Sequence, residues 1–278
     1  TYGAGFSYSP EWPILEGLTV GVDYYNVKYE NLLATETAQG ISSAQGAAWA
    51  AALCPPAPVV ALPAGACFDI ASDPKVVRDF DTGTGSGSLT PFRIYADRFN
   101  ASSVETDGFD FNLTYDRDWG IIPGDVVIRN ETTYVNKFEF QAAPGSPILE
   151  GAGNRNIDTP IARSIPQWLS NTYVGWGLGN HAANVIVRYI SDYYDGRTAG
   201  TTNKIDSWTT VDVQYSYDLT DALNFHGNTL FTIGLNNVMD EDPPFVASNV
   251  AGGNDFGYDV KVHDPRGRML YFRIAQGF

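Results

Sequence analysis

The chain closes on the stretch Arg266-Gly267-Arg268-Met269-Leu270-Tyr271-Phe272-Arg273-Ile274-Ala275-Gln276-Gly277-Phe278. Apolar residues recur at alternate positions in it, namely Leu270, Phe272, Ile274 and Phe278. A two-residue period predicts a β-strand with one apolar face. The last residues of soluble domains are usually polar and frayed, so we expect this strand to be paired to its end. A closed sheet in a membrane does this, because hydrocarbon offers the backbone no other hydrogen-bonding partner. The alternative is a docked edge strand of a soluble sandwich.

The composition narrows the class of protein. The chain has 278 residues, of which 13% are aromatic and 28 are glycine, which favours a β protein rich in turns. Lys and Arg number 17 against 32 Asp and Glu, a net charge of −15. Nucleic acid is therefore not an expected partner, because phosphate binding needs a basic face. The sequence lacks an apolar run of about 18 residues, which excludes a transmembrane helix.

The two cysteines indicate the cellular compartment of the protein, and the first residue bears on processing of its N-terminal part. Cys54 and Cys67 lie in one Pro/Ala-rich loop, which favours a local disulfide in an oxidising compartment. Closing such a loop stabilises a protein by roughly 3 kcal/mol on the chain-entropy model. Two free thiols and a metal site are the alternatives, and the metal site is less favoured because no second Cys or His pair stands nearby. Thr1 already begins a strand-like run, so we expect a removed leader or an upstream part of the protein.

Alternation of apolar and polar residues predicts about nine strands. The expected strands lie near residues 2–8, 18–29, 109–115, 125–140, 167–178, 184–189, 210–217, 231–236 and 268–278. Their connections alternate in length. Short links fall near Pro10, Gly120, Gly179 and Asp221, and long ones at 35–102, 142–164, 195–204 and 239–265. Outer-membrane barrels show this asymmetry between tight periplasmic turns and long outer loops. Counting back from Phe278 at a periplasmic end places every long loop outside.

Strand length and charge also favour a membrane barrel. Several runs reach the roughly 9–11 residues that a tilted membrane strand needs, above the roughly 5–6 of soluble strands. The apolar parities at 109–115, 185–189, 211–217 and 231–235 carry no charge, as lipid contact requires. In the second strand the apolar parity switches after Tyr25, which a β-bulge or exit of the strand above the membrane would explain.

Four segments, taken in order, resemble the C-terminal part of the β-barrel of TonB-dependent outer-membrane receptors. They are Leu18 to Leu33 with its Val-Asp-Tyr-Tyr-Asn-Val-Lys-Tyr core, Asn100 to Tyr115 with Glu105-Thr106-Asp107-Gly108-Phe109-Asp110, Gly234 to Asp240 followed by Pro243-Pro244, and Gly267-Arg268 leading to Phe278. The resemblance implies an all-β, antiparallel transmembrane barrel of 22 strands in the Gram-negative outer membrane. It also implies an N-terminal plug domain, which residues 1–278 do not show, and import energised by TonB through that missing part.

The resemblance leads to a functional expectation with two alternatives. We expect an active-transport receptor for a scarce ligand such as a siderophore or other metal chelate, a vitamin or an oligosaccharide. The alternatives are a passive porin-type channel and a soluble β-sandwich binding module. An enzyme is not expected, because His181 and His226 fall in short turns and His263 in a long loop, without a catalytic Ser-His-Asp grouping. No cofactor is implied, and Asp240-Glu241-Asp242 lacks the spacing of a calcium loop.

Two groups of residues are candidates for binding. Ligand capture is expected on outer loops and strand ends, where the aromatic or cationic side chains are Trp49, Phe92, Arg93, Tyr95, Tyr193, Tyr194, Arg197, Phe245, Phe256 and Tyr258. For Tyr193 and Tyr194 a place in the interfacial aromatic girdle is an equal alternative. The apolar residues Leu270, Phe272, Ile274 and Phe278 resemble the signal read by the barrel-assembly machinery, and contact with outer-membrane lipid is their simpler role.

Overall fold

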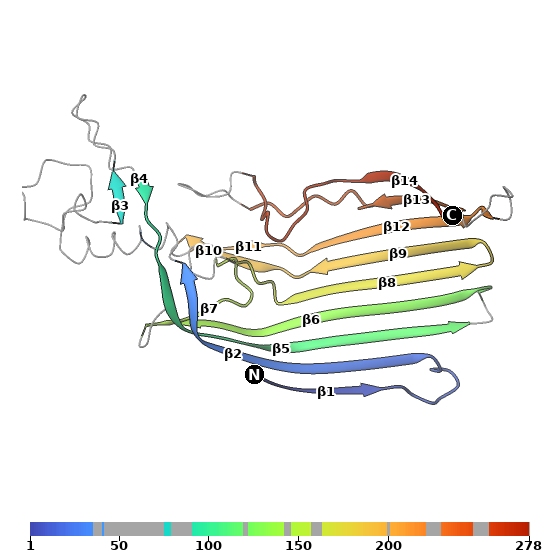
Figure 1. Ribbon diagram of the computed structural model, residues 1–278, viewed down its shortest axis with the longest axis horizontal. Coiled ribbons are helices and arrows are strands. Elements are labelled where there is room, and N and C mark those ends of the chain that lie inside the picture. The colour runs from blue at the N-terminus through green and yellow to red at the C-terminus, as the bar shows by residue number, and fades with distance from the viewer. Residues whose placement is uncertain are drawn as a thin grey trace, which may run out of the picture.

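The computed structural model describes residues 1–35, 41, 75–78, 91–118, 122–141, 146–156, 163–198, 201–220, 229–246 and 256–277. Within these residues nine strands follow one another along a single antiparallel sheet (Figure 1). In spatial order they are β1 (Tyr2–Tyr8), β2 (Leu18–Thr35), β5 (Arg98–Asp118), β6 (Asp125–Gln141), β8 (Trp168–Leu178), β9 (His181–Ile190), β12 (Trp208–Asp218), β13 (Thr229–Asn236) and β14 (Met269–Gln276). The nine strands expected from alternation are confirmed.

Five shorter strands lie off this path of nine. β7 (Ile148–Glu150) pairs with β6, β10 (Tyr193–Thr198) pairs with β11 (Thr201–Ile205), and β3 (Val76–Arg78) pairs with β4 (Pro91–Ile94). The segment 195–204, expected to be a loop, therefore contains most of the β10–β11 hairpin. Among the described residues no helix is long and apolar enough to cross a membrane.

Long and short connections separate to opposite ends of the sheet. The ends of β1, β5, β8 and β12 and the starts of β2, β6, β9 and β13, which the short links connect, lie at the right in Figure 1. The opposite ends of the strands lie at the left, together with β3, β4, β10 and β11 from the long links. This is the arrangement predicted from the sequence, with the end of β14 on the side of the short turns.

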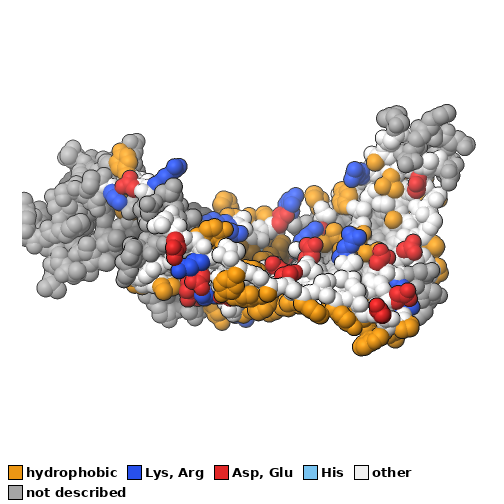
Figure 2. Space-filling view, turned by 60° about the horizontal axis from the view of Figure 1, so that its bottom comes forward, with side chains coloured by type: hydrophobic (Ala, Val, Ile, Leu, Met, Phe, Trp, Pro, Cys, Tyr) orange, Lys and Arg blue, Asp and Glu red, His pale blue; other side chains and the backbone are white. Residues whose placement is uncertain are grey.

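Cross-strand register keeps apolar side chains on one face of the sheet. Val213 pairs with both Val185 on β9 and Leu235 on β13, and Ile233 pairs with Phe272 on β14. Because opposite residues of antiparallel strands point to the same side, these pairings build a continuous apolar face. In Figure 2 the hydrophobic side chains gather along the lower edge of the sheet, and charged side chains lie mainly above that edge. The side chain of Phe272 is 63% exposed, so this face is not packed between two sheets.

Aromatic side chains mark both ends of the apolar face. Toward the long loops Tyr24 contacts Phe109 and Tyr134 contacts Trp168, with ring centroids 5.2 and 4.4 Å apart. Toward the short turns lie Tyr8, Tyr115, Trp176 and Tyr217 on the same parity. Two aromatic rows that bracket an apolar band are typical of strands that cross a membrane.

β2 continues beyond the aromatic row without a break. Its pairing with β5 runs in unbroken register from Leu18 to Glu30, so there is no bulge at Tyr25. Beyond Tyr24 the parity of the apolar face carries charge instead, since Lys28 pairs with Glu105. On β6, Lys137 follows the same change and lies 2.6 Å from the Glu105 carboxylate. Exit of the strand above the apolar band, one of the two explanations offered, accounts for the parity switch.

The terminal segments that carried the family resemblance contact each other. The Asp240 carboxylate accepts a hydrogen bond from the backbone N–H of Arg268 at 2.7 Å. A Cβ on Gly267 would lie 2.9 Å from the same carboxylate, which explains the glycine before Arg268. The side chain of Asp240 is therefore used to fix the start of β14, in a loop where a calcium site was considered from the sequence.

Candidate functional site

Buried polar residues from three separate segments meet beside the long-loop end of the sheet. We call them the outer-loop cluster, which consists of Arg155, Ser164, Tyr193, Asp195 and Asp259. Each of these residues is at most 8% exposed. Arg155 and Ser164 come from the connection between β7 and β8, Tyr193 and Asp195 from β10, and Asp259 from the connection between β13 and β14.

Asp259 is the centre of the outer-loop cluster. Its Oδ2 accepts hydrogen bonds from the Ser164 hydroxyl at 2.5 Å and the Tyr193 hydroxyl at 3.0 Å. The same oxygen lies 3.6 Å from Nε of Arg155, and the Arg155 Nη1 donates to Asp195 at 2.9 Å. A buried carboxylate is stable only when it is paired in this way, so the cluster holds the three loop segments together.

Burial keeps the ring groups of this region uncharged. Burial, assisted by the negative charge of Asp259, raises the pKa of the Tyr193 phenol far above its ordinary value, so Tyr193 acts as a neutral donor. The His263 ring stacks against the Tyr193 ring at 6.1 Å and meets the Trp208 ring edge-on at 5.3 Å. Burial lowers the pKa of the His263 imidazole, and the nearby Asp259 opposes that effect only in part.

Exposed aromatic side chains lie on the segments that the outer-loop cluster fixes. The Tyr194 side chain is 44% exposed, and its backbone is held by hydrogen bonds to Gly153 and Arg155. Phe256 is 71% exposed, and its ring centroid lies 6.3 Å from that of Tyr258. Phe245 is also exposed, and the backbone N–H of the next residue donates to Gly257 O at 2.8 Å. A backbone hydrogen bond therefore joins the two segments that carry Phe245, Phe256 and Tyr258.

The structure places the remaining candidates as follows. Tyr95 follows β4 and is exposed. Tyr193 is 1% exposed and lies inside the outer-loop cluster, because its ring packs beside Ile205 and its hydroxyl is used by Asp259. The backbones of Phe92 and Arg93 lie in β4 and that of Arg197 in β10, but their side chains lie outside the described part. Trp49, Cys54, Cys67 and Phe278 also lie outside the described residues.

The polar face of the sheet has a hollow near the start of β14. It has a volume of about 330 Å³. Its lining residues are Arg188, Trp208, Thr210, Asp212, Asn236, Asn237, Asp264, Arg266, Gly267 and Met269. Arg188 donates to Asp212, and Arg266 makes a two-point contact with Asp264. Arg188 and Asp212 fall on the polar parity of their strands, but no pattern in the sequence brings them beside Arg266.

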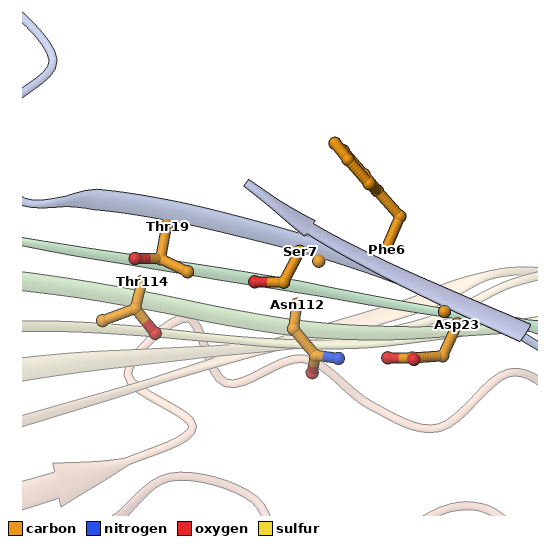
Figure 3. A pocket seen from close by; sticks show the side chains of 8 residues that line it. Phe6, Ser7, Thr19, Asp23, Asn112 and Thr114 are labelled. Carbon is orange, nitrogen blue, oxygen red and sulfur yellow. The ribbon is translucent and has the colours of Figure 1, made fainter. Parts of the chain in front are cut away.

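A second hollow of about 350 Å³ lies on the polar face at the other side of the sheet. Figure 3 shows Ser7, Asp23 and Asn112 on one side of the strands, with Phe6 pointing away from them. Glycines at positions 5 and 21 line this hollow, and Gly5 leaves space for the Asp23 carboxylate. The polar face is thus hollowed at both sides.

Comparison with known proteins supports the interpretation of the fold. The family model described as "TonB dependent receptor-like, beta-barrel" matches residues 1–238. The chain belongs to the TonB-dependent receptor family. No curated protein matches it. The family consists of β-barrel receptors of the outer membrane, which transport ligands and are not enzymes.

Solved structures of TonB-dependent receptors share the fold. A variant of the ferric enterobactin receptor PfeA from Pseudomonas aeruginosa is similar with a TM-score of 0.54 at 14% identity, over 99% of this chain and 30% of the receptor. Another PfeA variant, in complex with enterobactin, gives 0.52 at 14% identity, over 98% of this chain and 30% of that one. The siderophore receptor PirA from Acinetobacter baumannii gives 0.51 at 12% identity, over 99% of this chain and 31% of that one. The chain thus spans about a third of the length of these receptors.

Proposed function

We propose that the receptor containing this chain imports a ferric siderophore or a similar metal chelate across the outer membrane, with energy supplied through TonB. The observation that carries this proposal is the match of the receptor barrel family over residues 1–238. The structural neighbours named as ferric enterobactin and siderophore receptors favour a metal chelate over a vitamin or an oligosaccharide.

Ligand capture is assigned to the aromatic side chains beside the outer-loop cluster. Phe245, Phe256 and Tyr258 offer ring surface at the long-loop end of the sheet, and Tyr194 lies on the neighbouring hairpin. Aromatic rings bind a large planar ligand with little loss of side-chain entropy, because they have few rotatable bonds. The outer-loop cluster keeps their backbones in place, which reduces the ordering cost of binding. Trp49, Phe92, Arg93, Tyr95 and Arg197 remain candidates from the sequence.

Uptake of radioactive iron tests this function. In a strain that lacks the receptor gene, ferric-siderophore uptake should return with the full-length receptor and only when TonB is present. Replacing Phe256 and Tyr258 together with alanine should weaken binding about tenfold or more, because each ring contributes about 1 kcal/mol or more at a binding surface. Val260→Ala, at an exposed residue of the same connection, is the matched control. Uptake that persists without TonB would favour the porin-type channel instead.

β14 is proposed to carry the assembly signal. Leu270, Phe272 and Ile274 are 53%, 63% and 73% exposed and share the apolar face. Phe278 has the same parity in the sequence. Removal of Phe278 from the full-length receptor should lower the amount of folded receptor in the outer membrane. An unchanged amount would leave lipid contact as the only role of these side chains.

A further inference from the structure

The hollow near the start of β14 lies in the polar wall of the sheet and beside the outer-loop cluster. We call it the β14 hollow. Trp208 lines it and belongs to the polar parity of β12, whereas Val211 and Val213 belong to the apolar parity. The Trp208 ring meets His263 edge-on at 5.3 Å, and the His263 ring stacks on Tyr193 of the outer-loop cluster. The β14 hollow therefore lies between the outer loops, where ligand capture is proposed, and the interior of the barrel.

Each cation of the β14 hollow is paired with a carboxylate that also lines the hollow. Arg188 donates to Asp212, and Arg266 donates to Asp264 from Nε at 2.9 Å and from Nη2 at 2.5 Å. The other lining residues are uncharged. The β14 hollow thus contains two guanidinium groups and two carboxylates, so it has no excess charge that would attract an anion. The N–H groups of Arg188 that Asp212 does not use can still donate to an uncharged ligand.

Trp208 adds a hydrogen-bond donor that has no acceptor. The residue is 8% exposed. Among the described residues that line the β14 hollow, its Nε1–H is the buried side-chain group for which the structure shows no partner. An indole nitrogen can only donate, and a buried N–H without an acceptor costs free energy. A ligand oxygen in the β14 hollow would remove that cost, so the hollow suits a ligand that carries oxygen acceptors.

The described wall of the barrel also lacks an excess of positive charge. Between the aromatic rows, the charged side chains on its polar parity are the carboxylates of Asp23, Asp110, Glu131 and Asp212 and the guanidinium groups of Arg129, Arg188 and Arg273. Asp23 and Asp110 lie directly opposite each other. The second hollow is lined by Asp23, and none of its lining residues is Lys or Arg. This part of the wall therefore does not attract a ligand with several negative charges.

From this charge balance and the unpartnered donor of Trp208, we propose that the β14 hollow is a ligand subsite that selects electroneutral metal chelates over anionic ones. Ferric iron bound by three hydroxamate groups, each with one negative charge, forms a neutral complex. Three catecholate groups, each with two negative charges, leave the ferric complex a trianion. The oxygens of a neutral chelate can accept from Trp208 and Arg188 without approaching an unpaired carboxylate. This inference rests on the proposed import of a metal chelate and adds the charge class of that chelate.

Equilibrium binding of two ferric chelates to the purified full-length receptor tests the charge class. A neutral ferric trihydroxamate and a trianionic ferric triscatecholate, both labelled with radioactive iron, are each equilibrated with the receptor in detergent. The trihydroxamate should bind at least about a hundredfold more tightly, because like charges at a binding surface repel strongly. If the triscatecholate binds as tightly or more tightly, this inference is overturned and the proposed function stands. If neither chelate binds, the proposed function fails and this inference fails with it.

Removal of one donor tests whether the ligand occupies the β14 hollow. Trp208→Phe keeps an aromatic ring beside His263 and removes the Nε1–H. The affinity for the trihydroxamate should fall about threefold to tenfold, as expected for the loss of one hydrogen bond. The variant should still migrate as a folded barrel before heating. An unchanged affinity would overturn the assignment of the ligand to this hollow.

A change of one charge tests whether the β14 hollow sets the selectivity. Asp264→Asn leaves Arg266 without its carboxylate, so the affinity for the triscatecholate should rise about tenfold, while that for the trihydroxamate should stay within about twofold. Asp206→Asn makes the same change of charge at an exposed residue outside the hollow and is the matched control. Equal effects of the two substitutions on triscatecholate binding would overturn the proposal.

Discussion

Replacing Asp259 with alanine should open the outer loops and leave the sheet intact. Asp259 is 2% exposed, and its Oδ2 is shared by Ser164, Tyr193 and Arg155. The substitution leaves the buried Tyr193 hydroxyl without its acceptor, at a cost of about 1–3 kcal/mol, and leaves the Ser164 hydroxyl only its longer hydrogen bond to Arg155 O at 3.3 Å. Arg155 keeps its contact with Asp195 at 2.9 Å, so the total stays below the full loss of a buried ion pair. We therefore expect the free energy of local opening to fall by about 3–5 kcal/mol.

Hydrogen exchange on the purified full-length receptor measures this opening. The backbone N–H of Arg155 bonds to Tyr194 O, and that of Tyr194 bonds to Gly153 O, so these amides report separation of the loop segments. Their exchange should accelerate at least about a hundredfold, with the sheet amides of β12 unchanged. Asp192→Ala is the control, because Asp192 is a half-exposed partner of Lys204 beside the same hairpin. Equal acceleration in both variants, or none in Asp259→Ala, would refute the role of Asp259.

Three further predictions concern charge, packing and pH. Because burial lowers the pKa of His263, the opened loop binds a proton more readily than the closed one, and the outer-loop cluster should open more easily as pH falls below about 6.5. His263→Phe should remove this dependence of loop opening on pH. The prediction would be contradicted if hydrogen exchange in the unaltered receptor, corrected for intrinsic rates, did not change with pH. Val213→Arg should lower the free energy of unfolding of the barrel by about 2–4 kcal/mol and Gln214→Arg by much less, because only the first substitution places a charge in lipid. Denaturant titration in lipid vesicles measures both losses, and equal losses would contradict this prediction. Gly234→Val should destabilise the barrel by about 1–3 kcal/mol, because a Cβ at this position would overlap the ring of Tyr271 on β14. A fully stable variant would show that the Tyr271 ring can move away.

The sequence predicted the sheet well because the strand pattern is local. Val213 and Ile233 could be assigned to one face from their own neighbours, and the pairing of β12 with β13 confirms that face. The polar face of the same strands could be assigned in the same way, since Gln214 alternates with Val213. The two-residue period of a strand does not depend on how the loops are arranged, so no information about distant residues was needed to assign the face of each side chain.

The outer-loop cluster could not be predicted, because its members lie far apart in the sequence. Arg155 and Asp195 are separated by 40 positions, and Ser164 and Asp259 by 95. An aspartate in a long loop is normally solvated, and nothing local distinguishes Asp259 from such residues. Tyr193 was expected among exposed aromatics for the same reason, and it is buried because Asp259 supplies the acceptor for its hydroxyl.

Spin-label accessibility along β12 tests most directly whether lipid lies on the apolar face of this sheet. A nitroxide is placed in turn at residues 211–217 of the full-length receptor in lipid vesicles, and its collisions with oxygen and with a water-soluble nickel complex are measured. The account predicts maximal oxygen collision at Val211, Val213 and Tyr215, and maximal nickel collision at Asp212 and Gln214. The opposite phase, or the absence of a two-residue period, would contradict the assignment of this sheet to the wall of a membrane barrel.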